Sequence, residues 1–202
     1  MDKKVIIQEF VDFVEGRMSF EVFWNNYENN HDYRDLLDIC IGSESRFTAW
    51  RKGTVNENIM LYDCTTCLGR QVVHRSIMFY LQYNNIITSP TTQYEDDVKF
   101  RQDIQPSYIS IEDEEYFNSI IASAPTGLSV VQQKKWLKEK IKSLFVYEKS
   151  PPRWIQDPEW PIVSGKPLVF KGQTKNDPED ERIWYTFYDP DTGEETTVVQ
   201  FY

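Results

Sequence analysis

The stretch that decides the fold class is residues 183–201, IWYTFYDPDTGEETTVVQF. Its two ends, IWYTFY and TTVVQF, are rich in aromatic and β-branched residues, which are enriched in β-strands. The segment between them, DPDTGEE, is dense in Pro, Asp and Gly, which favour turns. The sequence therefore predicts an antiparallel hairpin whose connection is longer than two residues.

Two tryptophans, Trp154 and Trp160, precede this hairpin, and Trp184 lies in its first strand. Aromatic residues occupy both alternating faces of IWYTFY, so we expect that strand to be covered on both sides. We interpret Trp154 and Trp160 as packing residues that hold the hairpin against helices. The alternative is that they line a cleft with Tyr185 and Tyr188, which would make the chain a peptide-binding scaffold.

Helical spacing dominates the chain before residue 150. Apolar stripes recur at intervals of three and four residues, which predicts amphipathic helices. The stripes are Ile6, Phe10 and Phe13; Phe20, Phe23, Trp24 and Tyr27; Tyr33, Leu36, Leu37, Cys40 and Ile41; Val73, Ile77, Tyr80 and Leu81; Tyr116, Phe117, Ile120 and Ile121; and Val130, Leu137, Ile141, Leu144 and Phe145. A weaker helix is expected over residues 94–104.

Capping residues predict where several of these helices begin and end. Gly16 and Gly42 should stop the first and third helices, and Ser19 should cap the second. Ser129 with Gln132 forms a capping box for the last helix, and Ser110 with Asp113 resembles one for the helix before it.

We therefore predict an α+β fold, with a mainly helical N-terminal two-thirds packed on a small antiparallel C-terminal β element. A chain of 202 residues with 40% hydrophobic residues can fill one core. We expect a single domain over residues 1–202, with a helical layer over residues 1–149 and a Trp-rich β-hairpin cap over residues 150–202.

The charge balance bears on the possible partners. The chain carries 22 Lys and Arg against 32 Asp and Glu, a net charge of -10. Nucleic acids and anionic membranes are bound mainly through Lys and Arg, so neither is expected as a partner. A basic protein fits an acidic chain better. The N-terminal sequence lacks an apolar signal core and the three cysteines are odd in number, so we expect a cytoplasmic protein with reduced thiols.

One group of residues could carry metal or thiol chemistry. Cys64 and Cys67 have the spacing of a zinc-binding or redox pair, and His74 follows on the same predicted helix. A structural zinc site needs four ligands, and seven residues of helix separate Cys67 from His74 by roughly 10 Å along the axis. We favour simple packing of the cysteines, and a metal- or thiol-dependent enzyme that uses these three residues remains the alternative.

No other pattern indicates catalysis. The acidic runs at residues 95–97, 112–115 and 177–181 place three or four charges together, which is typical of solvated faces or helix starts. The segment DPDTGEE lacks the ligand spacing of a calcium loop. We therefore expect no enzyme activity and no cofactor.

Two stretches carry a family resemblance: EFVDFVEGRMSFEVFWNNYENNHDYRDLL near the start, and PRWIQDPEWPIVSGKPLVFKGQ with YTFYDPDTGEETTVVQFY at the end. They resemble small bacterial immunity-type proteins of polymorphic toxin systems. The resemblance implies a non-enzymatic cytoplasmic protein that binds and neutralises a cognate toxin domain. An acidic face would suit a basic toxin. The residues we select for such a face are Glu112, Asp113, Glu114 and Glu115, with Glu179, Asp180 and Glu181 as a second run.

Overall fold

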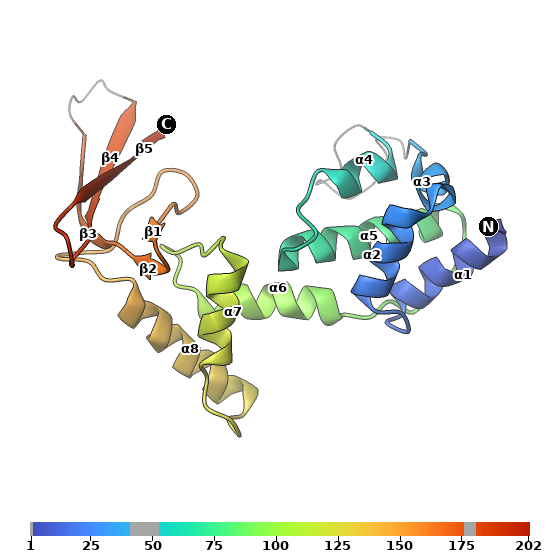
Figure 1. The fold of residues 1–202 in the computed structure, drawn as a ribbon, viewed down its shortest axis with the longest axis horizontal. Helices are drawn as coiled ribbons and strands as arrows, with labels where there is room; N and C mark the ends of the chain where they lie inside the picture. The colour runs from blue at the N-terminus through green and yellow to red at the C-terminus, as the bar shows by residue number, and fades with distance from the viewer. Residues whose placement is uncertain (1, 41–52, 176–180) are drawn as a thin grey trace. The chain divides into compact units, whose positions relative to one another are not determined.

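The computed structural model describes residues 2–40, 53–175 and 181–202 (Figure 1). The predicted α+β class is confirmed, because the described helices are followed by two small antiparallel sheets near the C-terminus. The chain divides into two compact units, residues 1–99 and residues 100–202. The helices are α1 (Lys3–Val14), α2 (Phe20–Asn29), α3 (His31–Leu37), α4 (Val55–Met60), α5 (Cys67–Tyr83), α6 (Gln93–Ile104), α7 (Glu114–Ala122) and α8 (Val130–Leu144).

The first unit is built from α1 to α5 and the start of α6, and its core is largely aromatic. The rings of Phe13 and Phe23 stack with their centroids 4.0 Å apart, and Phe10 meets Tyr33 and Tyr80 edge-on. The predicted stripes on α1, α2 and α5 all contribute to this core. The aromatic face of α2 is thus explained by packing.

The turn from α1 to α2 follows the predicted signals. Gly16 has a φ of +76°, a conformation that glycine adopts without steric cost, and α1 ends at Val14. The side chain of Ser19 accepts a hydrogen bond from the amide of Val22, as expected of the N-cap. Both predictions are confirmed.

The third helix and its surroundings differ from the prediction. Helix α3 ends at Leu37, and Cys40 lies in an isolated β-bridge with Thr54, so Cys40 does not belong to that helix. Ile41 and Gly42 lie outside the described residues. Helix α4 was not predicted, although Thr54 and Glu57 form a capping box that marks its start.

The second unit combines α7 and α8 with two sheets. The strands are β1 (Ile162–Val163), β2 (Lys166–Pro167), β3 (Val169–Thr174), β4 (Arg182–Tyr188) and β5 (Glu195–Phe201). Strands β1 and β2 pair with each other, and the other three form a sheet in the order β3-β4-β5. The predicted hairpin is β4 and β5, in which Ile183 faces Gln200 and Tyr188 faces Glu195. The amide of Asp189 donates to the carbonyl oxygen of Glu194 over 2.9 Å and closes the turn.

The core of the second unit lies between one face of this sheet and the helices. Ile183, Tyr185 and Phe187 of β4 are buried there, with Leu137 and Ile141 of α8. Helices α7 and α8 therefore share a core with the strands, and the boundary that we placed between residues 149 and 150 falls inside the second unit. The single-domain assignment stays a prediction.

Strand β4 is not covered equally on its two faces. Ile183, Tyr185 and Phe187 are buried, but the alternate residues Trp184 and Tyr188 are only partly buried. Among the described residues, neither of the two joins the core cluster. The expectation that both faces would be covered is thus met on one face only.

The start of α7 corrects a predicted cap. Asp113, and not Ser110, is the N-cap, because its carboxylate accepts a hydrogen bond from the amide of Tyr116 over 2.8 Å. Residues 110–112 precede the helix. For α8, the capping box of Ser129 and Gln132 is present as predicted.

Within the described parts of the chain, every helix is too short or too polar to cross a membrane.

Candidate functional site

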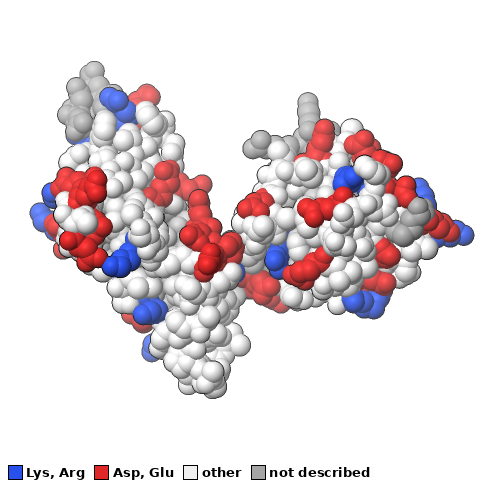
Figure 2. All heavy atoms as spheres, in the orientation of Figure 1, with Lys and Arg blue, Asp and Glu red and all other residues white. Residues whose placement is uncertain are grey.

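The candidate partner-binding surface is the acidic run at the start of α7. Figure 2 shows Asp and Glu side chains gathered over this part of the second unit. Glu112, Asp113 and Glu115 are exposed and Glu114 is partly buried. Asp113 and Glu114 contact other groups of the protein and form a structural pair. Glu112 and Glu115 form a pair that is open to solvent.

Asp113 and Glu114 stabilise the helix start. The carboxylate of Asp113 caps α7. An oxygen of Glu114 lies 2.9 Å from Nη1 of Arg101, an ion-pair distance, although Nη1 makes no well-aligned hydrogen bond there. The second guanidinium nitrogen of Arg101 donates to the side-chain oxygen of Asn118 over 2.7 Å, and the guanidinium lies 4.9 Å from the centre of the Phe117 ring. The Arg101 group therefore braces the first turns of α7.

Glu112 and Glu115 are the open pair. Neither carboxylate has a hydrogen-bond or ion-pair partner among the described residues. Both flank the helix start, where the backbone N–H groups give the helix its positive end. These two residues are the part of the predicted run that a partner can reach without breaking an internal contact.

The second predicted run is described only in part. Glu179 and Asp180 lie outside the described residues. Glu181 is exposed, and its backbone carbonyl accepts a hydrogen bond from the amide of Tyr202 over 2.9 Å. Only the first run can therefore be built residue by residue.

The cysteines and the histidine of the alternative enzyme hypothesis have separate environments. Burial, followed by the nearby carboxylates of Asp63 and Glu28, raises the pKa of the Cys64 thiol, which disfavours the nucleophilic thiolate. Cys67 and His74 lie on the continuous helix α5, seven residues apart. Among the described residues, no three His, Cys, Asp or Glu side chains are grouped as metal ligands.

His74 itself is a core residue. It is 1% exposed, and its Nε2 lies 3.0 Å from the carbonyl oxygen of Val14. Burial lowers the pKa of its imidazole, so the ring is neutral at pH 7. This position suits a packing histidine that links two helices.

The tryptophans proposed for a peptide cleft are packed. The indole N–H of Trp160 donates to the carbonyl oxygen of Leu168 over 2.7 Å, and that of Trp154 donates to the carbonyl oxygen of Tyr108 over 2.9 Å. Trp160 meets Phe145 edge-on at 5.4 Å, next to the end of α8. The prediction that both residues pack is confirmed: Trp160 contacts the C-cap residue of α8, whereas Trp154 packs on Tyr185 of β4.

Comparisons with protein-family models, with curated proteins and with solved structures found no significant match to this chain.

Proposed function

We propose that this chain is a non-enzymatic cytoplasmic immunity protein that binds a cognate bacterial toxin domain and blocks it. The observation that carries the proposal is the pair of open carboxylates, Glu112 and Glu115, at the start of α7 in a chain of net charge -10. The partner is a folded toxin domain with a basic surface.

The surroundings of this pair favour protein binding. Asp113 and the Arg101–Glu114 ion pair fix the helix start. Groups on a fixed backbone lose less conformational entropy when a partner binds than groups on a mobile loop. Glu112 and Glu115 can therefore contribute charge to a complex at a reduced entropic cost.

Charge of this kind acts mainly on the rate of association. An acidic surface attracts a basic partner over a distance set by the ionic strength, and it also disfavours acidic competitors. A toxin that acts on nucleic acid needs a basic active surface, so an acidic binder would compete for that surface. This class of toxin is the one that the proposal favours.

The test is co-expression with a toxin. If the gene directly upstream encodes a large secreted protein, the C-terminal domain of that protein is the probe, produced in a bacterial host with and without this chain. We expect growth arrest with the toxin domain alone and growth with both proteins. The matched control carries Glu112→Lys and Glu115→Lys, which should restore much of the arrest because the charge is reversed. Arrest that is unchanged by the wild-type chain would contradict the proposal.

A further inference from the structure

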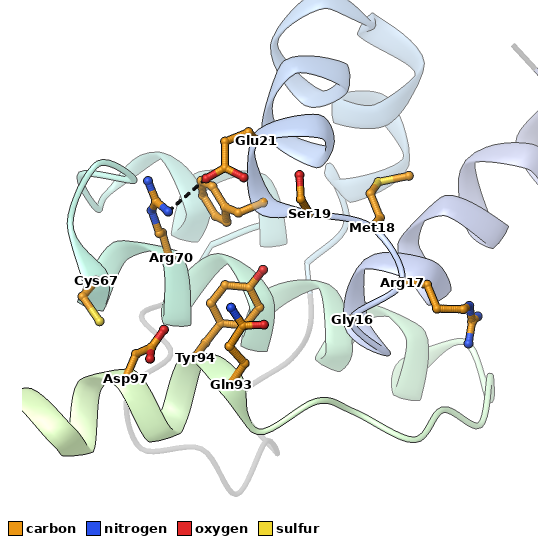
Figure 3. Close-up of a pocket in the computed structure, with 11 residues that line it drawn as sticks. Gly16, Arg17, Met18, Ser19, Glu21, Cys67, Arg70, Gln93, Tyr94 and Asp97 are labelled. Carbon is orange, nitrogen blue, oxygen red and sulfur yellow. Dashed lines mark hydrogen bonds and ion pairs between the residues drawn. The ribbon is translucent and has the colours of Figure 1, made fainter. Parts of the chain in front are cut away.

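A hollow of 370 Å³ in the first unit lies among the first turns of three helices (Figure 3). Helix α2 contributes Phe20 and Glu21, α5 contributes Cys67 and Arg70, and α6 contributes Tyr94 and Asp97. Its volume is at the lower end of the range of ligand pockets, roughly 300–1,000 Å³. The hollow is therefore large enough for a small molecule.

A largely buried tyrosine lines this hollow. Tyr94 is only 7% exposed, and its hydroxyl has no hydrogen-bond partner among the described residues. Figure 3 shows the ring rising from α6 into the space below α2, with the hydroxyl at its upper end. Burial raises the pKa of this hydroxyl to about 12, with a further contribution from the Glu21 carboxylate. The group is thus protonated at pH 7 and free to donate to a guest.

One wall of the hollow is positively charged. The Arg70 side chain is 40% exposed; its guanidinium lies 3.1 Å from the exposed Glu21 carboxylate and 4.9 Å from the centre of the Phe20 ring. Arg70 stands in the first turns of α5, whose N-terminal end carries a partial positive charge. A guanidinium has five N–H groups, so the ion pair with Glu21 leaves donors for a carboxylate.

A negative charge lies on the opposite side. Asp97 is exposed on α6, and its carboxylate has no ion-pair or hydrogen-bond partner among the described residues. In Figure 3 it points from α6 toward the side of Arg70 and Cys67. The unpartnered Asp97 carboxylate and the Arg70 guanidinium thus give the lining of the hollow one group of each charge.

The charged groups that line the hollow indicate which class of ligand it can bind. A phosphate or another dianion would meet the carboxylates of Asp97 and Glu21, and a metal cation would meet the guanidinium of Arg70. A small zwitterion satisfies both sides, because its carboxylate can accept from Arg70 and Tyr94 while its ammonium group donates to Asp97.

We propose that this hollow binds a free α-amino acid, with the carboxylate at Arg70 and the Tyr94 hydroxyl and the ammonium group at Asp97. The site lies in the first unit and uses none of the residues assigned to toxin binding. It stands or falls independently of the proposed function.

The test is isothermal titration calorimetry on the full chain, with L-alanine, L-leucine and L-glutamine as separate probes. Propionate and ethylamine serve as half-ligands that carry one charge each. We expect saturable one-to-one binding of at least one amino acid, and binding of each half-ligand that is weaker by about tenfold or more. Asp97→Asn and Tyr94→Phe should each weaken the amino acid by about tenfold.

Asp96→Asn is the matched control, because Asp96 neighbours Asp97 but accepts a hydrogen bond from the Thr92 hydroxyl and does not line the hollow. The affinity of the Asp96→Asn variant for the amino acid should equal that of the wild-type chain. The circular dichroism spectrum of each variant checks that it folds. If Tyr94→Phe does not fold, Asp97→Asn still tests the proposal, because Asp97 is exposed and its substitution leaves the core intact. The absence of saturable binding by any probe, equal binding of propionate and the amino acids, or equal losses in Asp96→Asn and Asp97→Asn would each overturn the proposal.

Discussion

The Nε2 atom of His74 lies 3.0 Å from the carbonyl oxygen of Val14, and this contact joins the middle of α5 to the last residue of α1. A carbonyl oxygen only accepts, so Nε2 carries the proton and donates. The same oxygen accepts a second hydrogen bond from the amide of Thr91 over 2.9 Å. One carbonyl thus holds together α1, α5 and the segment that leads into α6.

The buried imidazole should make stability depend on pH. Desolvation lowers the pKa of His74 from its ordinary value of 6.5; the hydrogen bond to Val14 and the Glu95 carboxylate oppose this shift, and Arg75 adds to it. Below pH 6.5 the unfolded chain takes up a proton on this residue while the folded chain does not. The free energy of unfolding should therefore fall as the pH drops from 6.5 toward the folded pKa, by at most about 1.4 kcal/mol per pH unit.

Urea unfolding of the wild-type chain and of His74→Gln, at pH values from about 7 to about 5, measures this effect. Glutamine can still donate to Val14 but does not titrate. We expect the wild-type curve to fall more steeply than that of the variant. Parallel curves would show that His74 titrates alike in the folded and the unfolded chain, and would contradict the lowered pKa.

The cap of α7 should affect stability without removing the binding surface. Asp113→Ala leaves the amide of Tyr116 without its side-chain acceptor, and we expect a loss of about 1 kcal/mol in the free energy of unfolding. The neighbouring change Glu112→Ala removes an open carboxylate and should alter stability by less than about 0.5 kcal/mol. Chemical denaturation of both variants compares them, and equal losses would argue against Asp113 as the cap.

Substitutions of Trp160 and Trp184 in the second unit should differ sharply in how much they lower the free energy of unfolding. Trp160→Ala removes a buried ring that contacts Phe145, Phe170 and Phe187, so we expect a loss of about 3–5 kcal/mol. Trp184→Ala, on the partly buried face of β4, is the matched control and should cost about half as much or less. Denaturation curves for the pair decide whether the core lies on the Trp160 side of the sheet.

Gly69 allows a close approach between α5 and the chain before it. A Cβ atom at this position would lie 1.9 Å from the carbonyl oxygen of Asp63, far inside contact distance. Gly69→Ala should therefore force the backbone to shift and cost about 1–3 kcal/mol, as overpacking does. At Gly127, with a φ of +83° and open space around it, alanine meets only backbone strain and should cost about 1 kcal/mol. Thermal unfolding of each variant tests whether Gly69→Ala loses more stability than Gly127→Ala.

The sequence predicted elements best where local signals agreed. The Phe13 and Phe23 stripes, the Ser19 cap and the Ser129–Gln132 capping box all matched the structure, because each depends on residues a few positions apart. Helix α4 was missed although Thr54 and Glu57 signalled it, since its six residues are too short to show a helical period. The hairpin of β1 and β2 was missed as well, although Ser164 and Gly165 form its two-residue turn with positive φ angles.

The candidate site was harder to predict than the fold. The sequence indicated four acidic residues together but not that Glu114 would meet Arg101, thirteen positions earlier, since that contact depends on how α6 and α7 pack. The hollow next to Tyr94 was not foreseen either. It brings together the starts of α2, α5 and α6, at Phe20, Cys67 and Gln93, and no local pattern encodes that approach.

The association rate between this chain and a toxin domain from which it protects the host in the co-expression test measures the central claim most directly. Stopped-flow measurements at low and at physiological ionic strength would compare the wild-type chain with the double variant Glu112→Ser, Glu115→Ser, and with Glu28→Ser as a control for charge elsewhere. We predict that the double variant associates about tenfold more slowly at low salt and that its rate depends less on salt, while the control stays close to the wild type. Rates and salt dependence that are the same for the double variant and the wild-type chain would contradict the assignment of this surface to toxin binding.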